Sequence, residues 1–349
     1  MAAVPPAGAQ SAYGVVAGSV DADREVALSV WRGNLGQDAR MAAKYAWFYQ
    51  DGDAGAPLLL KLHHLASDAW VGIASAGPRR MRWQGREIVA GVLVDLAVDA
   101  GHRSLGPALQ LQQAMMAHGR ERFALLYGFP NPKAVALCRH VGYAPLGELV
   151  RHARPLRVGR YLAGRLPSML AGPAAWLADA ADYLRLRLAR TRLRSRWSDG
   201  VVPEMDALWQ DSEPGRGPVA VRDRAFLAWR FDRCPLARTR YLLVNDRSGA
   251  LQAWFACQAD DAALHVRDFW SRRGAAGPSA AEVTALLRAA RAAGHASVSM
   301  EFLGPAAALA GWQACGFRAR GKRPVIGIAA SGDARDLDGL WLTSADEDE

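Results

Sequence analysis

A polar, glycine-containing turn within the stretch from Leu93 to Ala108 carries the residues best placed for chemistry. The apolar residues at its start predict a buried strand in which Asp95 is the only charge. Arg103, Gly106 and Ala108 then have the spacing R-x-x-G-x-A, and a helical pattern follows. A helix N-terminus offers unpaired N–H groups and a partial positive charge, and a glycine lets an anion approach the backbone closely. The stretch therefore predicts an anion-binding junction between a strand and a helix.

Two residues punctuate the helix after this junction. Pro107 is expected at its first position, where the missing N–H costs no hydrogen bond, and Gly119 marks its end. The spacing differs from the dinucleotide fingerprint G-x-G-x-x-G, and no Lys-Ser or Lys-Thr pair follows as in a P-loop. Both of those nucleotide-binding motifs are therefore excluded.

A second strand and helix come next. Residues 123–129 (FALLYGF) predict the strand, and residues 132–140 predict a short helix that Asn131 can cap. Val141-Gly142-Tyr143 follows. In this order the two segments resemble the coenzyme A-binding signatures of the GNAT acetyltransferases, which are Q/R-x-x-G-x-G/A after one strand, then N-x-x-A and G-F/Y after the next. The resemblance covers residues 20–155 or so.

The resemblance implies acetyl-CoA as the acyl donor. In that family the two strands splay apart, the acyl-pantetheine arm lies between them, and the turn before the helix cradles the pyrophosphate. An amine attacks the thioester directly within a ternary complex. The implied coenzyme contacts in this sequence are Leu96, Ala97, Val98, Arg103, Ser104, Leu105, Gly106, Pro107, Ala108 and Asn131.

Acyl transfer to an amine also requires a base that takes the amine proton. Asp95 is the first candidate, because a carboxylate on a buried strand has a raised pKa and can act as a base. The same position equally suits a buried aspartate that only accepts backbone hydrogen bonds. Glu87, on the preceding strand, is the second candidate, and His63 or His64 is the third.

The acid that protonates the leaving thiolate is the least clear assignment. Many GNAT proteins carry a tyrosine four residues before the G-F/Y pair, and this sequence has Cys138 there. A thiol can donate a proton, but a free cysteine is more often a small buried apolar residue. Tyr127 and Tyr143 are displaced substitutes for the missing tyrosine.

Composition limits the remaining choices. The four cysteines form no C-x-x-C pair and the eight histidines are scattered, so a reducing compartment and no metal site are expected. The net charge of +9 equals that of residues 151–197 alone, which hold eleven arginines and two aspartates. A high isoelectric point with so local an origin does not predict a DNA partner. No secretory signal or membrane span is found, and a cytoplasmic location is expected.

The chain repeats itself. KYAWFY, which contains Trp47, recurs as FLAWRF, which contains Trp229, and core packing explains this tryptophan pair better than ligand contact. Leu93-Val94-Asp95 likewise corresponds to Val266-Arg267-Asp268. The loop after Asp268 lacks the R-x-x-G-x-A spacing, so the second copy is expected to be degenerate for coenzyme binding.

The repeat predicts the tandem GNAT fold, an α/β (α+β) architecture of two mixed sheets flanked by helices. The expected organisation is a disordered lead-in over residues 1–18, a coenzyme-binding domain over 19–156, an arginine-rich helical linker over 157–200, the degenerate copy over 201–330, and an acidic tail over 331–349. The last residues of the tail, 344–349, are expected to be disordered.

The linker admits three interpretations, since leucines alternate with arginines along it, and one of them is a cradle for an acidic acceptor or a partner. Its arginine stems can cover apolar surface while the charged ends stay in water. Alternatively, it is a basic amphipathic helix that lies on an anionic membrane surface, which would place the protein at the inner face of the membrane.

Three functions are compatible with these patterns. The first is an acetyl-CoA-dependent N-acetyltransferase that acts on a small-molecule amine or on an amino sugar of an envelope or exopolysaccharide precursor. The second, a Fem-type aminoacyl transferase that uses aminoacyl-tRNA, has no need of a coenzyme pyrophosphate turn. The third is a non-catalytic coenzyme-binding module, which the cysteine at position 138 supports.

Overall fold

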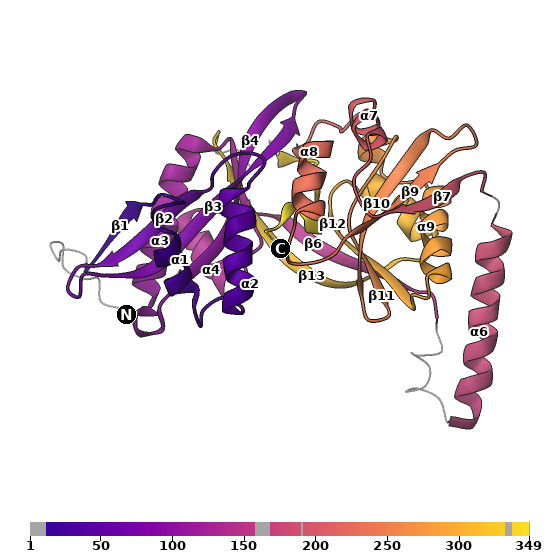
Figure 1. The fold of residues 1–349 in the computed structure, drawn as a ribbon, viewed down its shortest axis with the longest axis horizontal. Coiled ribbons are helices and arrows are strands. Elements are labelled where there is room, and N and C mark those ends of the chain that lie inside the picture. Colours follow the sequence, from indigo (N-terminus) through magenta and orange to yellow (C-terminus); the bar gives the residue numbers. More distant parts are fainter. Residues whose placement is uncertain (1–11, 158–167, 190, 332–336, 349) are drawn as a thin grey trace.

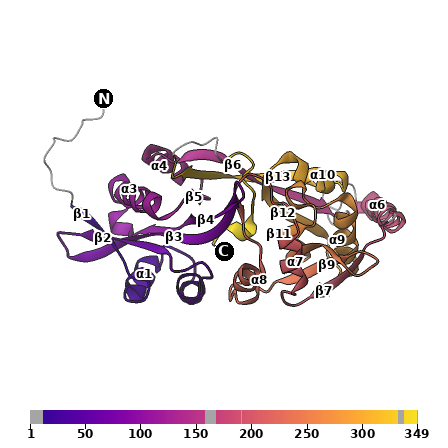
Figure 2. The same ribbon diagram turned by 90° about the horizontal axis from the view of Figure 1, so that it is seen from above.

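The computed structural model describes residues 12–157, 168–189, 191–331 and 337–348 (Figure 1). Its first half resembles a complete α/β unit. The elements of this half are β1 (Tyr13–Ala17), α1 (Arg24–Trp31), α2 (Asp38–Lys44), η1 (Tyr45–Gln50), β2 (Leu58–His64), β3 (Ala69–Trp83), β4 (Arg86–Val98), η2 (Ala100–His102), α3 (Leu105–Arg122), β5 (Leu125–Gly128), α4 (Ala134–Val141) and β6 (Ala144–Pro155). Helices α3 and α4 cover one face of this half's strands and α1 lies on the other (Figure 2).

The second half follows the same order of elements. These are α6 (Ser168–Leu188), β7 (Arg194–Ser198), α7 (Glu204–Gln210), β8 (Val219–Ala220), α8 (Arg224–Leu227), η3 (Ala228–Asp232), β9 (Arg240–Asn245), β10 (Leu251–Asp260), β11 (Ala263–Ser271), η4 (Gly274–Ala276), α9 (Ala280–Ala292), β12 (Ser297–Leu303), α10 (Ala306–Ala314), β13 (Arg318–Ala329), β14 (Leu342–Thr343) and η6 (Ser344–Asp346). In each half two strands pair in parallel across an intervening helix, β4 with β5 and β11 with β12.

The two halves meet at the repeated tryptophans. The indole rings of Trp47 and Trp229 stack with centroids 5.1 Å apart. Trp47 Nε1 donates to the Trp229 carbonyl at 2.8 Å, and Trp229 Nε1 donates to the Trp47 carbonyl at 3.3 Å. This reciprocal contact confirms that the pair serves core packing, and it places the pair at the contact between two equivalent segments, η1 and η3.

The predicted pair of sheets is joined into one continuous 14-stranded mixed sheet. The joint is made by the last strand of each half, because β13 lies between β5 and β6 while β6 pairs with β12. Ile326 lies opposite Gly128 of the first half, and His152 lies opposite Met300 of the second. Each half therefore completes the sheet of the other.

Two predicted boundaries are wrong for the same reason, since strand pairing extends past them. Tyr13–Ala17 forms β1 and pairs with β2, so these residues belong to the sheet, while residues 1–11 lie outside the described part of the chain. Within the predicted linker, α6 is helical as expected, but Arg194–Ser198 forms β7 and pairs with β9. Residues 158–167 and 190 also lie outside the described residues.

The expectation of disorder is wrong for residues 344–348, which belong to a described stretch, residues 337–348, here called the acidic segment. Strand β14 pairs with the end of β12, and Asp346 is fully buried. Buried arginines hold this segment. Arg222 pairs with Asp346 at 3.1 Å, and Arg79 and Arg230 donate to backbone carbonyl oxygens of residues 347 and 345 at 3.0 Å and 2.8 Å. An acidic composition predicts a solvated segment only when the protein interior offers no cations to pair with it. Here the interior offers buried arginines.

Candidate functional site

The centre of the site is a bulge in β4. Ile73 and Ser75 of β3 pair with Ala97 and Val94, so Asp95 and its successor together oppose a single residue of β3. Asp95 has a backbone φ of 52°, which is unusual for a residue with a side chain. Bulges re-aim side chains and interrupt the hydrogen-bond ladder. This one turns the aspartate towards the space beside the sheet.

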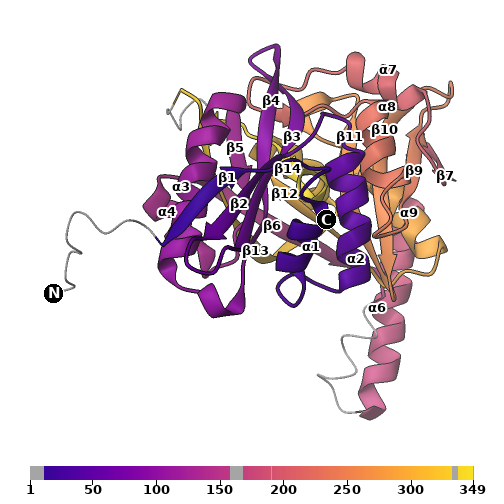
Figure 3. The same cartoon turned by 60° about the vertical axis from the view of Figure 1, so that its left-hand side comes forward.

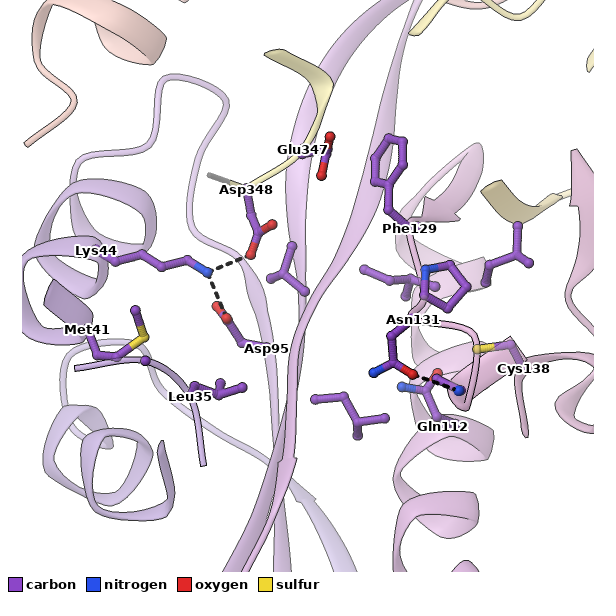
Figure 4. A pocket seen from close by; sticks show the side chains of 18 residues that line it. Leu35, Met41, Lys44, Asp95, Gln112, Phe129, Asn131, Cys138, Glu347 and Asp348 are labelled. Carbon is purple, nitrogen blue, oxygen red and sulfur yellow. Dashed lines mark hydrogen bonds and ion pairs between the residues drawn. The ribbon is translucent and has the colours of Figure 1, made fainter. Parts of the chain in front are cut away.

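The same strand parts from its neighbour just before the bulge. The parallel pairing of β4 with β5 ends at Leu93 and Gly128. Beyond these residues a cavity of about 420 Å³ opens, here called the β4–β5 cavity (Figure 4). Side chains and backbone from α2, β4, α3, the end of β5, α4 and the acidic segment surround it, among them Met41, Lys44, Leu96, Asp95, Gln112, Phe129, Asn131, Cys138, Glu347 and Asp348.

Helix α3 contributes Gln112 to this cavity, and it begins two residues earlier than expected. Its first residue is Leu105, so Pro107 is the third helical residue and still falls within the turn whose N–H groups have no helical acceptor. Ser104 precedes the helix without a side-chain cap. Gly106 is exposed, and a Cβ at this residue would meet no atom within 4 Å. The backbone N–H groups of this turn are thus accessible to a ligand.

Arg103 makes contacts within the protein, whereas the sequence pattern predicted contact with the coenzyme. Its Nε donates to the Val98 carbonyl at 3.1 Å, and its guanidinium also contacts the Asn34 side chain. The arginine therefore braces the turn between β4 and α3, and it occupies a carbonyl that was expected to face the pantetheine arm. Of the ten predicted coenzyme contacts, Leu96 and Asn131 line the β4–β5 cavity. The others form the end of β4, the turn and the first residues of α3.

A buried cation joins two carboxylates in the cavity wall. Lys44 Nζ lies 2.7 Å from Asp95 Oδ1 and 2.5 Å from Asp348 Oδ2 (Figure 4). Tyr49 donates from its hydroxyl to Asp95 Oδ2 at 2.8 Å. Exposure separates the two acids, since the side chain of Asp95 is 5% exposed and that of Asp348 is 26% exposed. Asp348 is thus the carboxylate that an incoming molecule can reach.

Burial and charge act against each other in this cluster. Burial raises the pKa of Asp95, and the ammonium of Lys44 offsets only part of that rise. Burial alone would lower the pKa of Lys44, but the carboxylates of Asp95 and Asp348 outweigh it, so the pKa is raised. Lys44 therefore stays charged at neutral pH. Because both oxygens of Asp95 already have donors, its role is to hold Lys44, and Asp348 is better placed to take a proton.

Three further side chains face the cavity from α3, the β5–α4 loop and α4. Asn131 Oδ1 accepts from the Ala134 N–H at 3.0 Å, which confirms the predicted capping contact. Burial raises the pKa of the Cys138 thiol, so the group stays protonated at neutral pH and can serve as a proton donor. Gln112 is buried on α3, and its Oε1 has no hydrogen-bond partner. That oxygen is available to a ligand amide.

Glu87 is wrong as a member of this site. It lies near the start of β4, eight residues from Asp95, which is about 26 Å along an extended strand. Its carboxylate is 55% exposed and lies 3.7 Å from Arg80. Sequence proximity misled here, because a long strand carries its two ends to different places.

The two histidines and two tyrosines considered as a base or an acid also lie elsewhere. His63 and His64 are bound to side chains of the β2–β3 turn, at 2.8 Å to Asp68 and 2.7 Å to Ser67. Tyr127 donates to the carbonyl of residue 346 at 3.0 Å, which ties β5 to the acidic segment. Tyr143 is buried in the core beneath α3. None of these four lines the β4–β5 cavity.

Sequence reasoning missed Lys44, Tyr49, Gln112 and Asp348. The internal repeat contained one signal that could have predicted Lys44. In the second half Asp268, the counterpart of Asp95, pairs with buried Arg222 at 3.1 Å, and Asp346 pairs with the same arginine. In both halves, therefore, a strand aspartate and an aspartate of the acidic segment share one buried cation. An acid kept at equivalent apolar strand positions indicates a buried cation nearby.

The corresponding space in the second half is filled by the chain itself. The parallel pairing of β11 with β12 ends at Val266 and Met300. Beyond it, β14 pairs with Phe302 and its successor, and Thr343 is fully buried there. A pantetheine arm would have to displace this strand. The filling supports the prediction that the second copy binds no coenzyme. Within the described ranges, no group of three or more His, Cys, Asp or Glu side chains could hold a metal ion.

Comparison with known proteins identifies the fold. No protein-family model matches the sequence, and no curated protein matches it. Solved structures do. A probable N-acyltransferase from Enterococcus faecalis superposes with a TM-score of 0.64 at 9% identity, over 92% of this chain and 73% of that one. A GCN5-related N-acetyltransferase from Kribbella flavida gives 0.61 at 16% identity, over 92% and 72% of the chains.

A tandem GNAT protein from the clavulanic acid biosynthesis pathway matches nearly end to end. The TM-score is 0.52 at 13% identity, over 91% of this chain and 98% of that one. At such identities the likeness shows the fold: two GNAT units in one chain, as the internal repeat predicts.

Proposed function

We propose that this chain, which has the tandem GNAT fold, is an acyl-CoA-dependent N-acyltransferase with its active site in the first half. One observation carries the proposal. Where β4 and β5 part, α3 begins at an uncapped N-terminus about two turns before Gln112, and the cavity that opens beside Gln112 has a reachable carboxylate, Asp348, in its wall. The first suits the pyrophosphate of a coenzyme, and the second suits an amine.

The residues present can carry out each step. The pantetheine arm would lie between the separated strands, with its amides beside Gln112 and the β4 backbone. Asp348 takes a proton from the acceptor ammonium, and the free amine attacks the thioester carbon. The tetrahedral oxyanion forms against the backbone of the β4 bulge at Asp95. The C–S bond then breaks, and the Cys138 thiol gives its proton to the leaving thiolate. The nitrogen of the new amide loses its second proton, which returns Cys138 to the thiol form, and Asp348 releases its proton to solvent.

Acetyl-CoA is the proposed donor, and a small-molecule amine or amino sugar is the proposed acceptor. We also propose that the reaction takes place in the cytoplasm. No helix in the described ranges is both long enough and apolar enough to cross a membrane.

The proposal is tested by coenzyme binding in Gly106→Trp. Because the space around this residue is open, an indole there would block the pyrophosphate turn without disturbing the fold. Acetyl-CoA at a hundredfold excess over Kd should stabilise the wild type by about 2.7 kcal/mol in thermal unfolding, and the variant should show no shift. Gly321→Trp is the matched control, since Gly321 is equally open but lies on β13.

Each other result has a definite meaning. Equal shifts in wild type and Gly106→Trp would place the coenzyme elsewhere and contradict the proposed site. A shift without acyl transfer to any amine would leave a coenzyme-binding module. No shift in any form, together with salt-dependent tRNA binding, would favour the aminoacyl transferase.

We further propose that α6 contacts an anionic membrane surface, and the described part of the helix supports this. The helix extends away from the body of the molecule (Figures 1 and 3). It is anchored on one side by Leu186, which is 6% exposed, and the opposite side presents Leu177, Leu184 and Leu188 at 62%, 53% and 67% exposure. Exposed Arg185 lies beside this stripe. An apolar stripe flanked by arginine suits an anionic bilayer surface.

Vesicle binding tests this contact. We expect the wild type to sediment with vesicles of phosphatidylserine and phosphatidylcholine, and Leu177→Ser/Leu184→Ser/Leu188→Ser to stay in solution, because each lost side chain removes apolar burial. Leu65→Ser/Val89→Ser, which changes exposed apolar residues of the first half, should sediment like the wild type. Sedimentation of the triple variant would contradict the proposal.

A further inference from the structure

A second cavity of about 710 Å³ lies beside the active site and is lined by four arginines. We name it the arginine cavity, after Arg40, Arg151, Arg238 and Arg267. We propose that it binds an acidic group, a carboxylate or a phosphate, on the acceptor amine. This inference rests on the proposed function, because it describes the other end of the same acceptor.

The floor of the cavity is one face of the second half's sheet. Residues 265–267 of β11 and 299–301 of β12 line the cavity, and among them Val266 and Met300 are buried apolar residues. The polar side chains that they offer to the cavity include His265, Arg267 and Glu301. Arg151 of β6 lies directly opposite Glu301 in the register. Neighbouring positions on one face of adjacent strands bring these side chains together.

The roof comes from the first half. Arg40 on α2 donates to the carbonyl of Leu236 at 3.3 Å, which closes the loop 236–238 over the cavity. Both halves thus build the cavity, as they build the sheet. A single GNAT unit would therefore form only part of the cavity wall.

The charge of the cavity favours an anion. Four arginines and two carboxylates, Asp260 and Glu301, line it, and one of these arginines, Arg238, also lies 3.7 Å from Asp199. Glu301 is already committed, since it pairs with Arg323 at 2.7 Å, and that arginine also pairs with Glu347. Guanidinium groups bind carboxylate and phosphate oxygens with paired hydrogen bonds, which makes this lining selective for such groups.

Two elements connect the arginine cavity with the β4–β5 cavity. Arg40 and Lys44 are one turn apart on α2, about 6 Å along the helix axis, and line one cavity each. The acidic segment lines the arginine cavity with Ser344 and the β4–β5 cavity with Asp348. An acceptor held by its acidic group at the arginines would present an amine several ångströms away to the Asp348 carboxylate.

Binding of the anion is measured first, independently of catalysis. Inorganic pyrophosphate is titrated into Gly106→Trp, in which the coenzyme turn is blocked, so that the arginine cavity is observed alone. Adding Arg151→Gln/Arg267→Gln should weaken the affinity at least tenfold, because charge-assisted hydrogen bonds are lost. Adding Arg86→Gln/Arg247→Gln, two exposed arginines outside the cavity, should leave the affinity unchanged. Equal affinities in both backgrounds would overturn the proposal.

Acceptor kinetics then follow in the otherwise unchanged chain. The acceptors are 6-aminohexanoate, 6-aminohexyl phosphate and neutral 6-aminohexanol, which share one primary amine. We expect the acidic acceptors to have a KM at least tenfold lower, and Arg151→Gln/Arg267→Gln to abolish this advantage without changing kcat for the neutral one. Whichever acidic acceptor has the lower KM identifies carboxylate or phosphate as the preferred group. Unfolding temperatures within a few degrees of wild type show that the variants fold.

The two proposals can fail separately. If all three amines react equally well and the arginine substitutions change nothing, the arginine cavity is not an acceptor site, although acyl transfer stands. If no amine reacts but pyrophosphate binding still depends on Arg151 and Arg267, the anion site stands and the proposed transferase falls.

Discussion

Asp348→Asn is expected to lower kcat for acyl transfer by about 10²–10⁴-fold, the usual effect of losing a general base. The carboxylate is the more exposed of the two that Lys44 holds, and it lies in the wall of the β4–β5 cavity. An amide of the same shape cannot accept the ammonium proton. The segment should stay in place, because Arg79 and Arg230 hold its backbone. The measurement is steady-state kinetics with acetyl-CoA and a turned-over amine.

The pH profile separates a base from a structural residue. In wild type, kcat/KM should rise with pH as the base loses its proton, and the variant should lack that limb. Coenzyme-dependent thermal stabilisation should be unchanged in the variant. Asp38→Asn, at the exposed start of α2, is the matched control and should retain full activity. If Asp348→Asn keeps its kcat while Asp95→Asn loses it, the base is Asp95.

Arg222→Met should destabilise the protein by about 3–5 kcal/mol, since it leaves two buried carboxylates without their cation. Arg222 is fully buried, 3.1 Å from both oxygens of Asp268 and 3.1 Å from Asp346. Burial already raises the pKa of Asp268 to about 6 with the guanidinium present. Urea unfolding at pH 7 measures the loss.

The sign of the pH dependence checks the cause. Without the arginine, both acids will bind protons in the folded state at a higher pH than in the unfolded chain. Their contribution to stability is then fully present below the unfolded pKa, near 4, and is lost as pH rises through the folded pKa. The deficit of Arg222→Met should therefore shrink between pH 7 and pH 5. Arg233→Met, at a half-exposed arginine, should cost less than about 1 kcal/mol at both values. A deficit independent of pH would contradict this account.

The local pattern predicted the strand, turn and helix of the junction because its signals are short-range. A strand, a turn with Gly106 and a helix are encoded by adjacent residues, and the structure places them within two residues of the expectation. The repeat likewise predicted the tandem fold, since self-similarity needs no knowledge of packing.

The carboxylate at the centre of the proposed chemistry could not be found this way. Lys44 and Asp348 are 304 residues apart, and no local pattern joins them. The acidic composition of the last residues indicated solvation, because composition does not reveal which buried arginines will meet them. Glu87 was misplaced for the converse reason, as nearness in sequence along β4 becomes distance in space.

The last strands of the two halves, β6 and β13, are exchanged, since each pairs with a strand of the other half. This exchange has a consequence for synthesis on the ribosome. Strand β5 ends at Gly128, and its partner β13 begins at Arg318. At about 5–20 residues per second, roughly 10–40 s pass between the two. During that interval the nascent first half carries an open sheet edge that only the second half can cover, and such edges invite pairing with other chains. The two halves lie in one chain, and the exchange of their last strands lets each half protect the open sheet edge of the other from pairing with other chains.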